Sequence, residues 1–478
     1  MAMIKNSIVL TFALTLIGVS TLHAQDEEQI VPVAEESIDE GSDYFVPDVT
    51  PEDELVAEFE LFKQLMKENV FDEADTVAKR VVELSIRTHG PQSNEFAKAL
   101  TNLAIVQFQT EQYDAAEQNF EAAIEIIEDS EDRLNAQLVN PLKGLGAAQL
   151  ESGRPDLATK TFRRAVHVTH VNEGPHNLDQ LDLLESIAET FVRMGDLDSA
   201  KEAQDTIYAI NVRKYELDTP GLVPSLLRRA QWQHKSGFIF DERATYRRAI
   251  RIIEEYSGRD SLELVEPLIL LGRSYFYLDA SGQTSFQNST MSSGEIYFRR
   301  AARITAEHPD TDWQVVVQAQ LALGDYYTYS NNPQRGHQVY VAAWNMLSQQ
   351  EDGLDVRRDQ LEQVVPLKQN KLPLFVSSGE DQTAPDDKDI PLLQGSISMG
   401  YTVSTRGRAT DIRMIEAQPT EFESMISLVQ REVRRRIYRP RLDGGEVVET
   451  PDLILVHKYF YRQSDLDSAG AAIEAESK

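Results

Sequence analysis

The feature that most constrains this chain is a pattern of small and aromatic residues that recurs every 42 residues. In its clearest copy, residues 94–128, two helical patterns flank a short turn. There Ala116, Phe120 and Ala123 follow Ala104 by 12, 16 and 19 residues. The small residues let two helices approach closely, and the aromatic ring fills the space between neighbouring pairs. One such hairpin cannot bury its own apolar face, so further copies are expected.

Six further copies share this spacing, once an insertion of ten residues, about 281–290, is allowed for in the sixth copy. In chain order, the equivalent residues are Phe62, Ala74, Ala78 and Val81; Gly146, Ala158, Phe162 and Ala165; Ala188, Ala200, Gln204 and Ile207; Ala230, Glu242, Tyr246 and Ala249; Gly272, Gly294, Phe298 and Ala301; and Gly324, Gly336, Tyr340 and Ala343. An ordinary helical bundle would not keep one spacing over seven copies. The pattern therefore predicts a mainly α protein, an α-solenoid of about seven helical hairpins over residues 55–350.

The pattern resembles the tetratricopeptide repeat (TPR), whose order of small, aromatic and small residues is matched over about 300 residues. A period of 42 residues rather than the common 34 looks like the long-helix variant of kinesin light chains. The resemblance implies protein partners, with an extended peptide or a partner helix bound in a groove lined by the first helix of each repeat. The implied groove residues are Thr101, Ile105, Phe108, Lys143, Glu189, Arg193, Gln231, Lys235, Arg273, Tyr277, Asp325 and Tyr329.

Composition and motifs exclude several function classes. The formal charge of −31 argues against a nucleic-acid-binding protein, and the lack of cysteine excludes disulfides, thiol catalysis and cysteine metal sites. His167, His170 and His176 lie close to Glu173, but their spacing does not match a zinc site, so we expect no metal. No nucleophile elbow, Walker loop, HExxH helix or dinucleotide fingerprint is present. We therefore expect no enzymatic activity, no cofactor and no small-molecule ligand.

The start of the chain indicates export. Residues 1–24 are typical of a secretory signal peptide, in which one lysine precedes an apolar run of residues 8–19 and cleavage is expected after Ala24. The run is short for a membrane span, and an uncleaved inner-membrane anchor is the alternative. The expected location is the periplasm. Residues 25–54 hold twelve acidic residues and no Lys or Arg, which predicts a disordered acidic leader.

The repeat pattern stops after residue 350. Residues 351–389 are expected to form a capping helix, at 356–365, and a linker rich in Pro, Ser and acidic residues. The tail, residues 464–478, is small and polar and is expected to be disordered.

Residues 390–463 are predicted to form a small α+β domain with the order ββαβ. Two alternating strands flank a turn at Arg406-Gly407, a helical pattern follows at 421–438, and the last strand begins at Leu453. This order resembles the C-terminal domain of TonB, the periplasmic energy transducer. The resemblance is carried by Gly395, Val403, Gly407, Ile412, Phe422 and Tyr438-Arg439-Pro440.

Arginines gather late in the predicted helix of this domain, at Arg431, Arg434, Arg435, Arg436, Arg439 and Arg441. The helix dipole favours cations there, and a patch for anionic lipid, cell-wall polymer or the acidic leader is the alternative.

The sequence is compatible with two functions. The first is a non-enzymatic scaffold of the bacterial cell envelope, which binds a polypeptide in the repeat groove and docks through its end domain. The alternative is a TonB-like energy transducer with a retained N-terminal anchor and membrane association.

Overall fold

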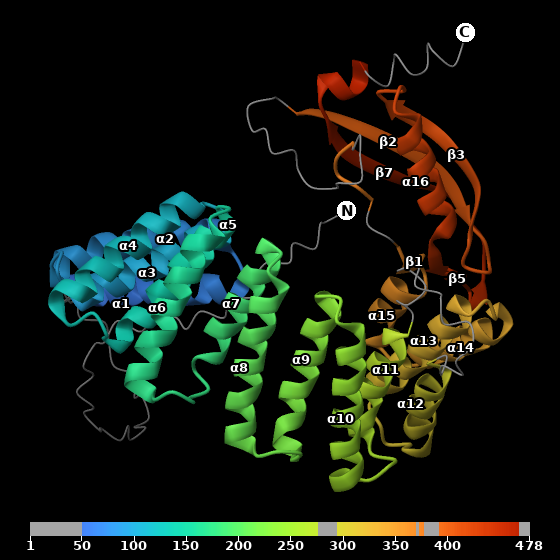
Figure 1. The fold of residues 1–478 in the computed structure, drawn as a ribbon, viewed down its shortest axis with the longest axis horizontal. Coiled ribbons are helices and arrows are strands. Elements are labelled where there is room, and N and C mark those ends of the chain that lie inside the picture. Colours follow the sequence, from blue (N-terminus) through green and yellow to red (C-terminus); the bar gives the residue numbers. More distant parts are fainter. Residues whose placement is uncertain (1–49, 276–293, 370–371, 377–391, 468–478) are drawn as a thin grey trace, which may run out of the picture. The chain divides into compact units, whose positions relative to one another are not determined.

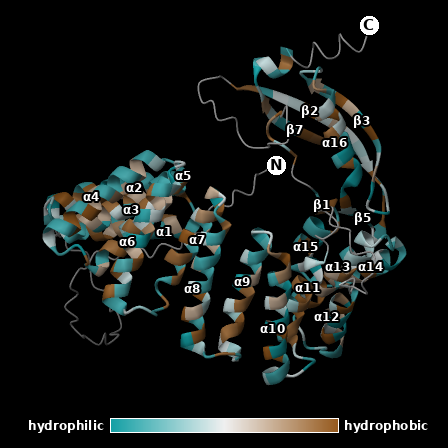
Figure 2. Cartoon of the chain, in the orientation of Figure 1, coloured by the Kyte–Doolittle hydropathy of each residue, from teal (hydrophilic) through white to brown (hydrophobic). Residues whose placement is uncertain are grey.

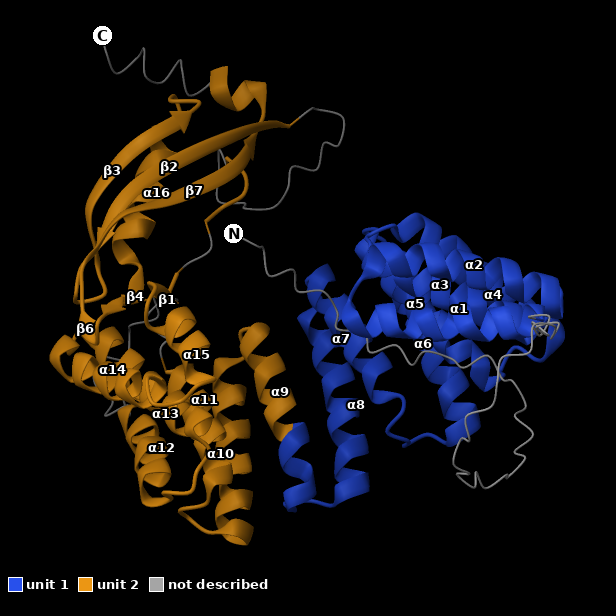
Figure 3. Cartoon of the chain, turned by 180° about the vertical axis from the view of Figure 1, so that it is seen from behind, with its two compact units in different colours: residues 1–225 blue, residues 226–478 orange. Residues whose placement is uncertain are grey.

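The computed structural model describes residues 50–275, 294–369, 372–376 and 392–467 (Figure 1). Two compact units, residues 1–225 and 226–478, divide the chain within one helix (Figure 3). The predicted signal peptide, most of the acidic leader and the ten-residue insertion lie outside the described residues. Within the described ranges, no helix is both long enough and apolar enough to span a membrane.

The repeat array consists of helices joined mainly by short turns. In unit 1 they are α1 (Pro51–Glu68), α2 (Phe71–His89), α3 (Asn94–Gln109), α4 (Tyr113–Ser130), α5 (Val139–Glu151), α6 (Pro155–Glu173), α7 (Leu181–Met194) and α8 (Leu197–Tyr215). The helix α9 (Val223–Lys235) contains the division, and α10 (Ile239–Ser257), α11 (Val265–Ser274), α12 (Glu295–Glu307), α13 (Trp313–Tyr329) and α14 (Pro333–Leu347) follow. Single 3₁₀ turns, Ala136–Leu138, Pro220–Leu222 and Leu262–Leu264, precede α5, α9 and α11.

Local sequence explains where several helices begin and end. Thr50 accepts a hydrogen bond from the Asp53 amide, while the Asp53 carboxylate accepts one from the Thr50 amide, which is a capping box. The helix α1 therefore begins within the predicted acidic leader. The expectation of disorder up to residue 54 is wrong for residues 51–54, which are helical. Pro155 opens α6, and Gly195 ends α7 with a φ of 78°.

Consecutive helices pair as hairpins, which confirms the predicted fold class. Contacts join α1 to α2, α3 to α4, α5 to α6 and α7 to α8 in unit 1, and α11 to α12 and α13 to α14 in unit 2. Between α9 and α10, the Trp232 and Phe238 rings stack with centroids 5.5 Å apart. Figure 2 shows hydrophobic and hydrophilic residues alternating along these helices, as expected of amphipathic segments.

Every residue of the predicted small–aromatic–small pattern is buried. The aromatic side chain of the second helix packs on a small residue of a first helix. A Cβ atom added at Gly146 would lie 2.7 Å from the Phe162 ring, and one at Gly324 would lie 2.5 Å from the Tyr340 ring. These glycines therefore set how closely the two helices of a hairpin approach.

The end of the chain forms a small α+β domain around one three-stranded sheet. Its elements are β2 (Leu393–Val403), β3 (Ala409–Gln418), α16 (Glu423–Arg435), β4 (Ile437–Arg439), β5 (Leu442–Asp443), β6 (Glu446–Val447) and β7 (Thr450–Tyr461). The sheet order is β3-β2-β7, with β2 antiparallel to both neighbours, and β2 turns into β3 through Gly407. Met425, Val429 and Val433 of α16 share one core with side chains of the sheet, which Figure 1 shows lying against this helix.

Three boundaries at this end of the chain differ from prediction. The capping helix is α15 (Gly353–Gln360), and Val365, its predicted end, lies in β1 (Val365–Lys368), which pairs antiparallel with β4. The helix predicted to reach Tyr438 ends at Arg435, because the backbone of Arg436 is extended and Tyr438 is buried in the pairing with β1. Residues 463–467 are helical, whereas disorder was expected from 464.

Part of the predicted linker also belongs to the fold. The Val376 amide donates to the Phe460 carbonyl (2.9 Å), and the Phe460 amide donates to the Leu374 carbonyl (2.7 Å). The rings of Phe375 and Phe460 lie 5.9 Å apart. Residues 374–376 thus cover the outer edge of β7, which the acidic composition of the linker did not indicate.

We expect Gly146→Ala to destabilise the protein although alanine is the better helix former. The added Cβ meets the fully buried Phe162 ring, and overpacking of this kind costs about 1–3 kcal/mol. The same change at an open helical site would stabilise by up to about 1 kcal/mol. Thermal unfolding decides the sign, and Phe162→Leu in the Gly146→Ala background should recover part of the loss. A higher melting temperature for Gly146→Ala would contradict the close-approach account.

The buried His457 should make the C-terminal domain less stable in acid. Burial, reinforced by Arg436, lowers the pKa of His457, and its Nε2 donates to the Pro373 carbonyl at 2.9 Å. The unfolded chain, with a pKa near 6.5, binds the proton more readily, so stability should fall as the pH drops from about 6.5 towards the folded pKa. The difference in unfolding free energy between about pH 7.5 and about pH 5.5, roughly one unit either side of the unfolded pKa, should be smaller for His457→Gln than for the unsubstituted chain. An equal pH dependence for His457→Gln and the unsubstituted chain would refute the assignment.

Candidate functional site

The groove residues predicted in α3 are buried. Thr101, Ile105 and Phe108 expose 7% of their surface or less. The helix α3 contacts α2, α4 and α5, so these side chains pack between helices, and the Thr101 hydroxyl donates to the Ala97 carbonyl at 2.8 Å. The expectation that they face a peptide is therefore corrected: they belong to the core of unit 1.

Two charged groove residues instead join the first helices of adjacent repeats. Lys143 of α5 lies 3.2 Å from Asp182 of α7. Arg193 of α7 lies 2.9 Å from Glu151 of α5 and 3.3 Å from Glu189. Lys143 is buried, whereas Arg193 and Glu189 remain partly accessible. Such pairs fix one repeat on the next, and only their exposed part is open to a partner.

The remaining predicted groove residues lie in different environments. Gln231, Lys235 and Arg273 are exposed, and Tyr277 lies outside the described residues. Tyr329 is half-buried, and Asp325 is buried. The exposed side chains, rather than the whole predicted set, are thus the candidates for contact with a partner.

Asp325 is covered by the C-terminal domain. Its two carboxylate oxygens each accept a hydrogen bond of 2.8 Å from Arg439 of β4, one from Nε and one from Nη2. The Tyr340 hydroxyl donates to Asp325 Oδ1 at 3.0 Å, and Arg439 Nη1 donates to the Gln360 backbone carbonyl and Oε1, both at 3.0 Å. A buried carboxylate is thereby matched to a guanidinium by a two-pronged contact.

Electrostatics keep Arg439 charged and Tyr340 protonated. Burial disfavours the charged form of Arg439, but the neighbouring Asp325 outweighs burial and raises the pKa of Arg439. Burial, together with Asp325, raises the pKa of Tyr340 well above its usual value. Tyr340 is therefore protonated at neutral pH and can act as a donor to the carboxylate.

Further contacts seat the same domain on α14 and on the end of α15. His337 Nε2 donates to the Thr405 carbonyl at 2.6 Å, and the Leu442 amide donates to the Leu361 carbonyl at 2.7 Å. Leu442 also joins an apolar cluster with Leu347 and Tyr340 of the last repeat. The stretch predicted as a peptide groove around Asp325 and Tyr329 is consequently occupied by this chain itself.

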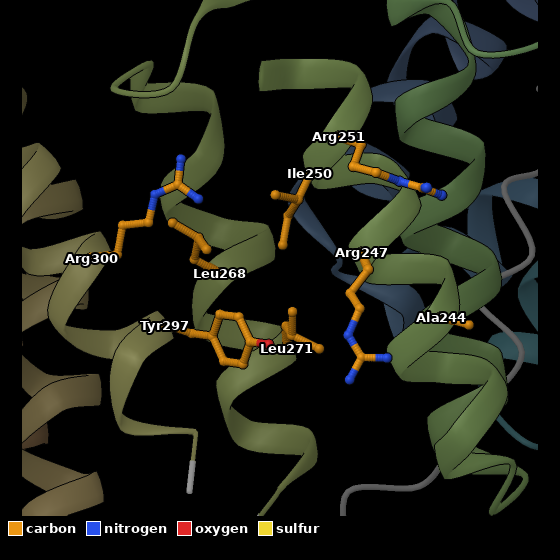
Figure 4. Close-up of a pocket in the computed structure, with 8 residues that line it drawn as sticks. All are labelled: Ala244, Arg247, Ile250, Arg251, Leu268, Leu271, Tyr297 and Arg300. Atoms are coloured by element: carbon orange, nitrogen blue, oxygen red, sulfur yellow. The ribbon is translucent and has the colours of Figure 1, made fainter. Parts of the chain in front are cut away.

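A separate pocket of about 430 Å³ lies among α10, α11 and α12 (Figure 4). Its apolar lining includes Ile250, Leu268 and Leu271, all of which are buried. Its polar and remaining residues are Ala244, Arg247, Arg251, Tyr297 and Arg300. Figure 4 shows Arg247 and Arg251 extending from one side of the pocket, with Tyr297 and Arg300 on the other.

Tyrosines hold the arginines beside this pocket. Arg247 Nη2 donates to the Tyr275 hydroxyl at 2.8 Å, and the Tyr275 and Tyr297 rings stack with centroids 5.9 Å apart. The buried Arg243 lies with its guanidinium carbon 3.9 Å from the Tyr275 ring centroid and donates to the Ser274 carbonyl at 2.8 Å. Burial and Tyr275 raise the pKa of Tyr297, so its hydroxyl stays protonated.

Sequence reasoning did not single out this pocket, although a signal was present. Arg243, Arg247 and Arg251 are spaced by four residues in α10, which places them along one face of a helix. The repeat pattern drew attention to first helices, whereas α10 and α12 are second helices.

His167 and His170 lie on α6 and His176 follows it, all three exposed. In the part of the chain that the structure describes, no group of three or more His, Cys, Asp or Glu residues is placed to hold a metal ion.

Comparison with known proteins identifies the repeats. A family model for the tetratricopeptide repeat matches residues 64–129 and 95–169, so the chain contains TPR repeats in this stretch. No curated protein matches the chain.

Several solved structures are similar to the chain at low identity. A putative kinesin light chain with TPR-like repeats from Podosopora anserina is 15% identical, with a TM-score of 0.38, over 43% of this chain and 97% of that one. The C-terminal part of a TPR repeat-containing protein from Cytophaga hutchinsonii is 13% identical, with a TM-score of 0.37, over 62% of this chain and 98% of that one. Aspartyl phosphate phosphatase F from Bacillus subtilis is 13% identical, with a TM-score of 0.39, over 64% of this chain and 73% of that one.

Loss of one partner of the Asp325–Arg439 pair should destabilise the protein strongly, whereas replacement of both partners should destabilise it little. Asp325→Asn leaves a buried guanidinium without its counter-charge, which should lower the free energy of unfolding by about 3–5 kcal/mol. The double variant Asp325→Leu/Arg439→Met should recover most of this loss, because apolar side chains need no counter-charge. Denaturant unfolding of the full chain measures the free energy of unfolding of the single and the double variant.

The matched control is the exposed pair of Arg413 and Asp452 in the same domain, 3.0 Å apart. Arg413→Gln should cost at most about 1 kcal/mol. If Asp325→Asn were no more harmful than Arg413→Gln, the buried pair would not hold the domain on the last repeat.

Proposed function

We propose that this protein is a non-enzymatic scaffold of the bacterial cell envelope that binds polypeptides through its repeat array. The observation that carries the proposal is the match of residues 64–169 to TPR repeats, within an array of seven helical hairpins in the described residues. Repeats of this kind imply protein partners, because they stack into an extended surface. The exposed Gln231, Lys235 and Arg273 are the groove residues that we assign to partner contact.

The C-terminal domain is assigned a second docking role, as expected of a TonB C-terminal-like domain. Its sheet has one face covered by α16, while Ile415, Ile454 and Val456 expose more than half of their surface. Ile415 approaches Gly400 on the strand between β3 and β7, so these apolar side chains share the uncovered face. An exposed apolar group on the two strands that flank β2 is typical of an interaction surface.

The buried contact of this domain with α13 and α14 favours the scaffold over the energy transducer. A transducer needs its end domain at the tip of a long spacer, whereas Arg439 and Leu442 hold this domain directly against the last repeat. A periplasmic location, with the signal peptide at residues 1–24 cleaved, is part of the proposal.

Crosslinked co-purification of the full chain from envelope fractions tests the function. Lys235→Glu/Arg273→Glu should lose partners of the array, and Ile454→Asp/Val456→Asp should lose partners of the end domain. Arg303→Gln, an exposed and ion-paired position, is the control and should retain both sets. Recovery of no protein above background, or of an unchanged set with both double variants, would overturn the proposal.

A further inference from the structure

The pocket among α10, α11 and α12 combines an apolar floor with positively charged walls. Its floor is made of the buried side chains Ile250, Leu268 and Leu271. Its walls carry the guanidinium groups of Arg247, Arg251 and Arg300, in a chain whose formal charge is −31. An inorganic anion would leave the floor unused, and a neutral apolar molecule would leave the guanidinium groups unused.

The arginines differ in how much of their charge is already matched. Arg300 lies 2.6 Å from Glu254 and also donates to the Arg259 carbonyl. Arg247 donates to the Tyr275 hydroxyl rather than to a carboxylate. Within the described residues, no carboxylate forms an ion pair with Arg247 or Arg251. Two positive charges on α10 are therefore available at the pocket.

The pocket is held in shape before any ligand arrives. Tyr275 fixes Arg247 through a hydrogen bond and stacks on Tyr297, and Arg243 packs on the other side of this pair. Side chains that are already ordered lose little conformational freedom on binding, which favours affinity. The volume of about 430 Å³ lies in the range of pockets that hold small molecules.

We propose that this pocket binds a small organic anion with an apolar body, whose carboxylate or phosphate ester head group meets Arg247 and Arg251. The apolar body packs on Ile250, Leu268 and Leu271, and Tyr297 lines the same pocket. This site does not rest on polypeptide binding by the repeats, and it departs from the sequence-based expectation of no small-molecule ligand.

Equilibrium dialysis of the full chain against octanoate and octyl phosphate tests the proposal. Saturable binding of at least one probe, with a Kd on the order of 1 mM or below, is expected. The tighter probe identifies the head group. Acetate, which has only the head group, and 1-octanol, which has only the tail, should bind at least about tenfold more weakly. Failure of both probes to bind, or equal binding of 1-octanol, would overturn the assignment.

Substitutions locate the binding within the molecule. Arg251→Gln removes one charge from an exposed position, and Arg247→Gln/Arg251→Gln should weaken probe binding by about tenfold or more. Arg303→Gln likewise removes one positive charge, but Arg303 lies on α12 outside the pocket. This variant should therefore bind the probes like the unsubstituted chain. Equal weakening by Arg251→Gln and Arg303→Gln would show a general charge effect and refute the site. Melting temperatures of all variants verify that they fold.

Discussion

The array depends on one steric constraint, the contact of an aromatic ring on a second helix with a residue that lacks a large side chain on a first helix. Phe162 on Gly146, Phe298 on Gly272 and Tyr340 on Gly324 leave no room for a Cβ atom without movement of a buried ring. Dense packing of this kind fixes the distance and angle of each hairpin. Because each hairpin then offers the same apolar face to the next, the stacking can repeat.

The last copy adds a polar function to the same contact. In the second, third and sixth copies the aromatic residue is phenylalanine, whereas Tyr340 in the seventh carries a hydroxyl that donates to Asp325. Asp325 in turn holds Arg439, so the packing of the final hairpin and the attachment of the C-terminal domain share one residue. Removing such ions from water is unfavourable, and their fixed geometry specifies one seating of the domain.

The sequence was sufficient for the repeats and for the long elements β2, β3, α16 and β7 of the end domain, because both follow from periodic burial. It was insufficient for Asp325, which the resemblance to TPR repeats placed in a peptide groove. The residue that covers Asp325, Arg439, is distant in the chain, and contacts of that range leave no local pattern. Val365 was assigned to a helix for a similar reason, since its strand pairing depends on β4. The pocket arginines of α10 were visible as a four-residue spacing, but only the fold shows which apolar side chains lie between α10 and α12.

The seating of Leu442 beside Leu347 and Tyr340 has a consequence for self-association. A repeat stack that ended on a bare hairpin would offer a surface complementary to another molecule's stack, and head-to-tail addition of molecules would then produce filaments without limit. Here that terminal surface is buried within the chain, against α15 and the strands β5 and β6. Growth from this end is thereby blocked by the same residues that position the end domain.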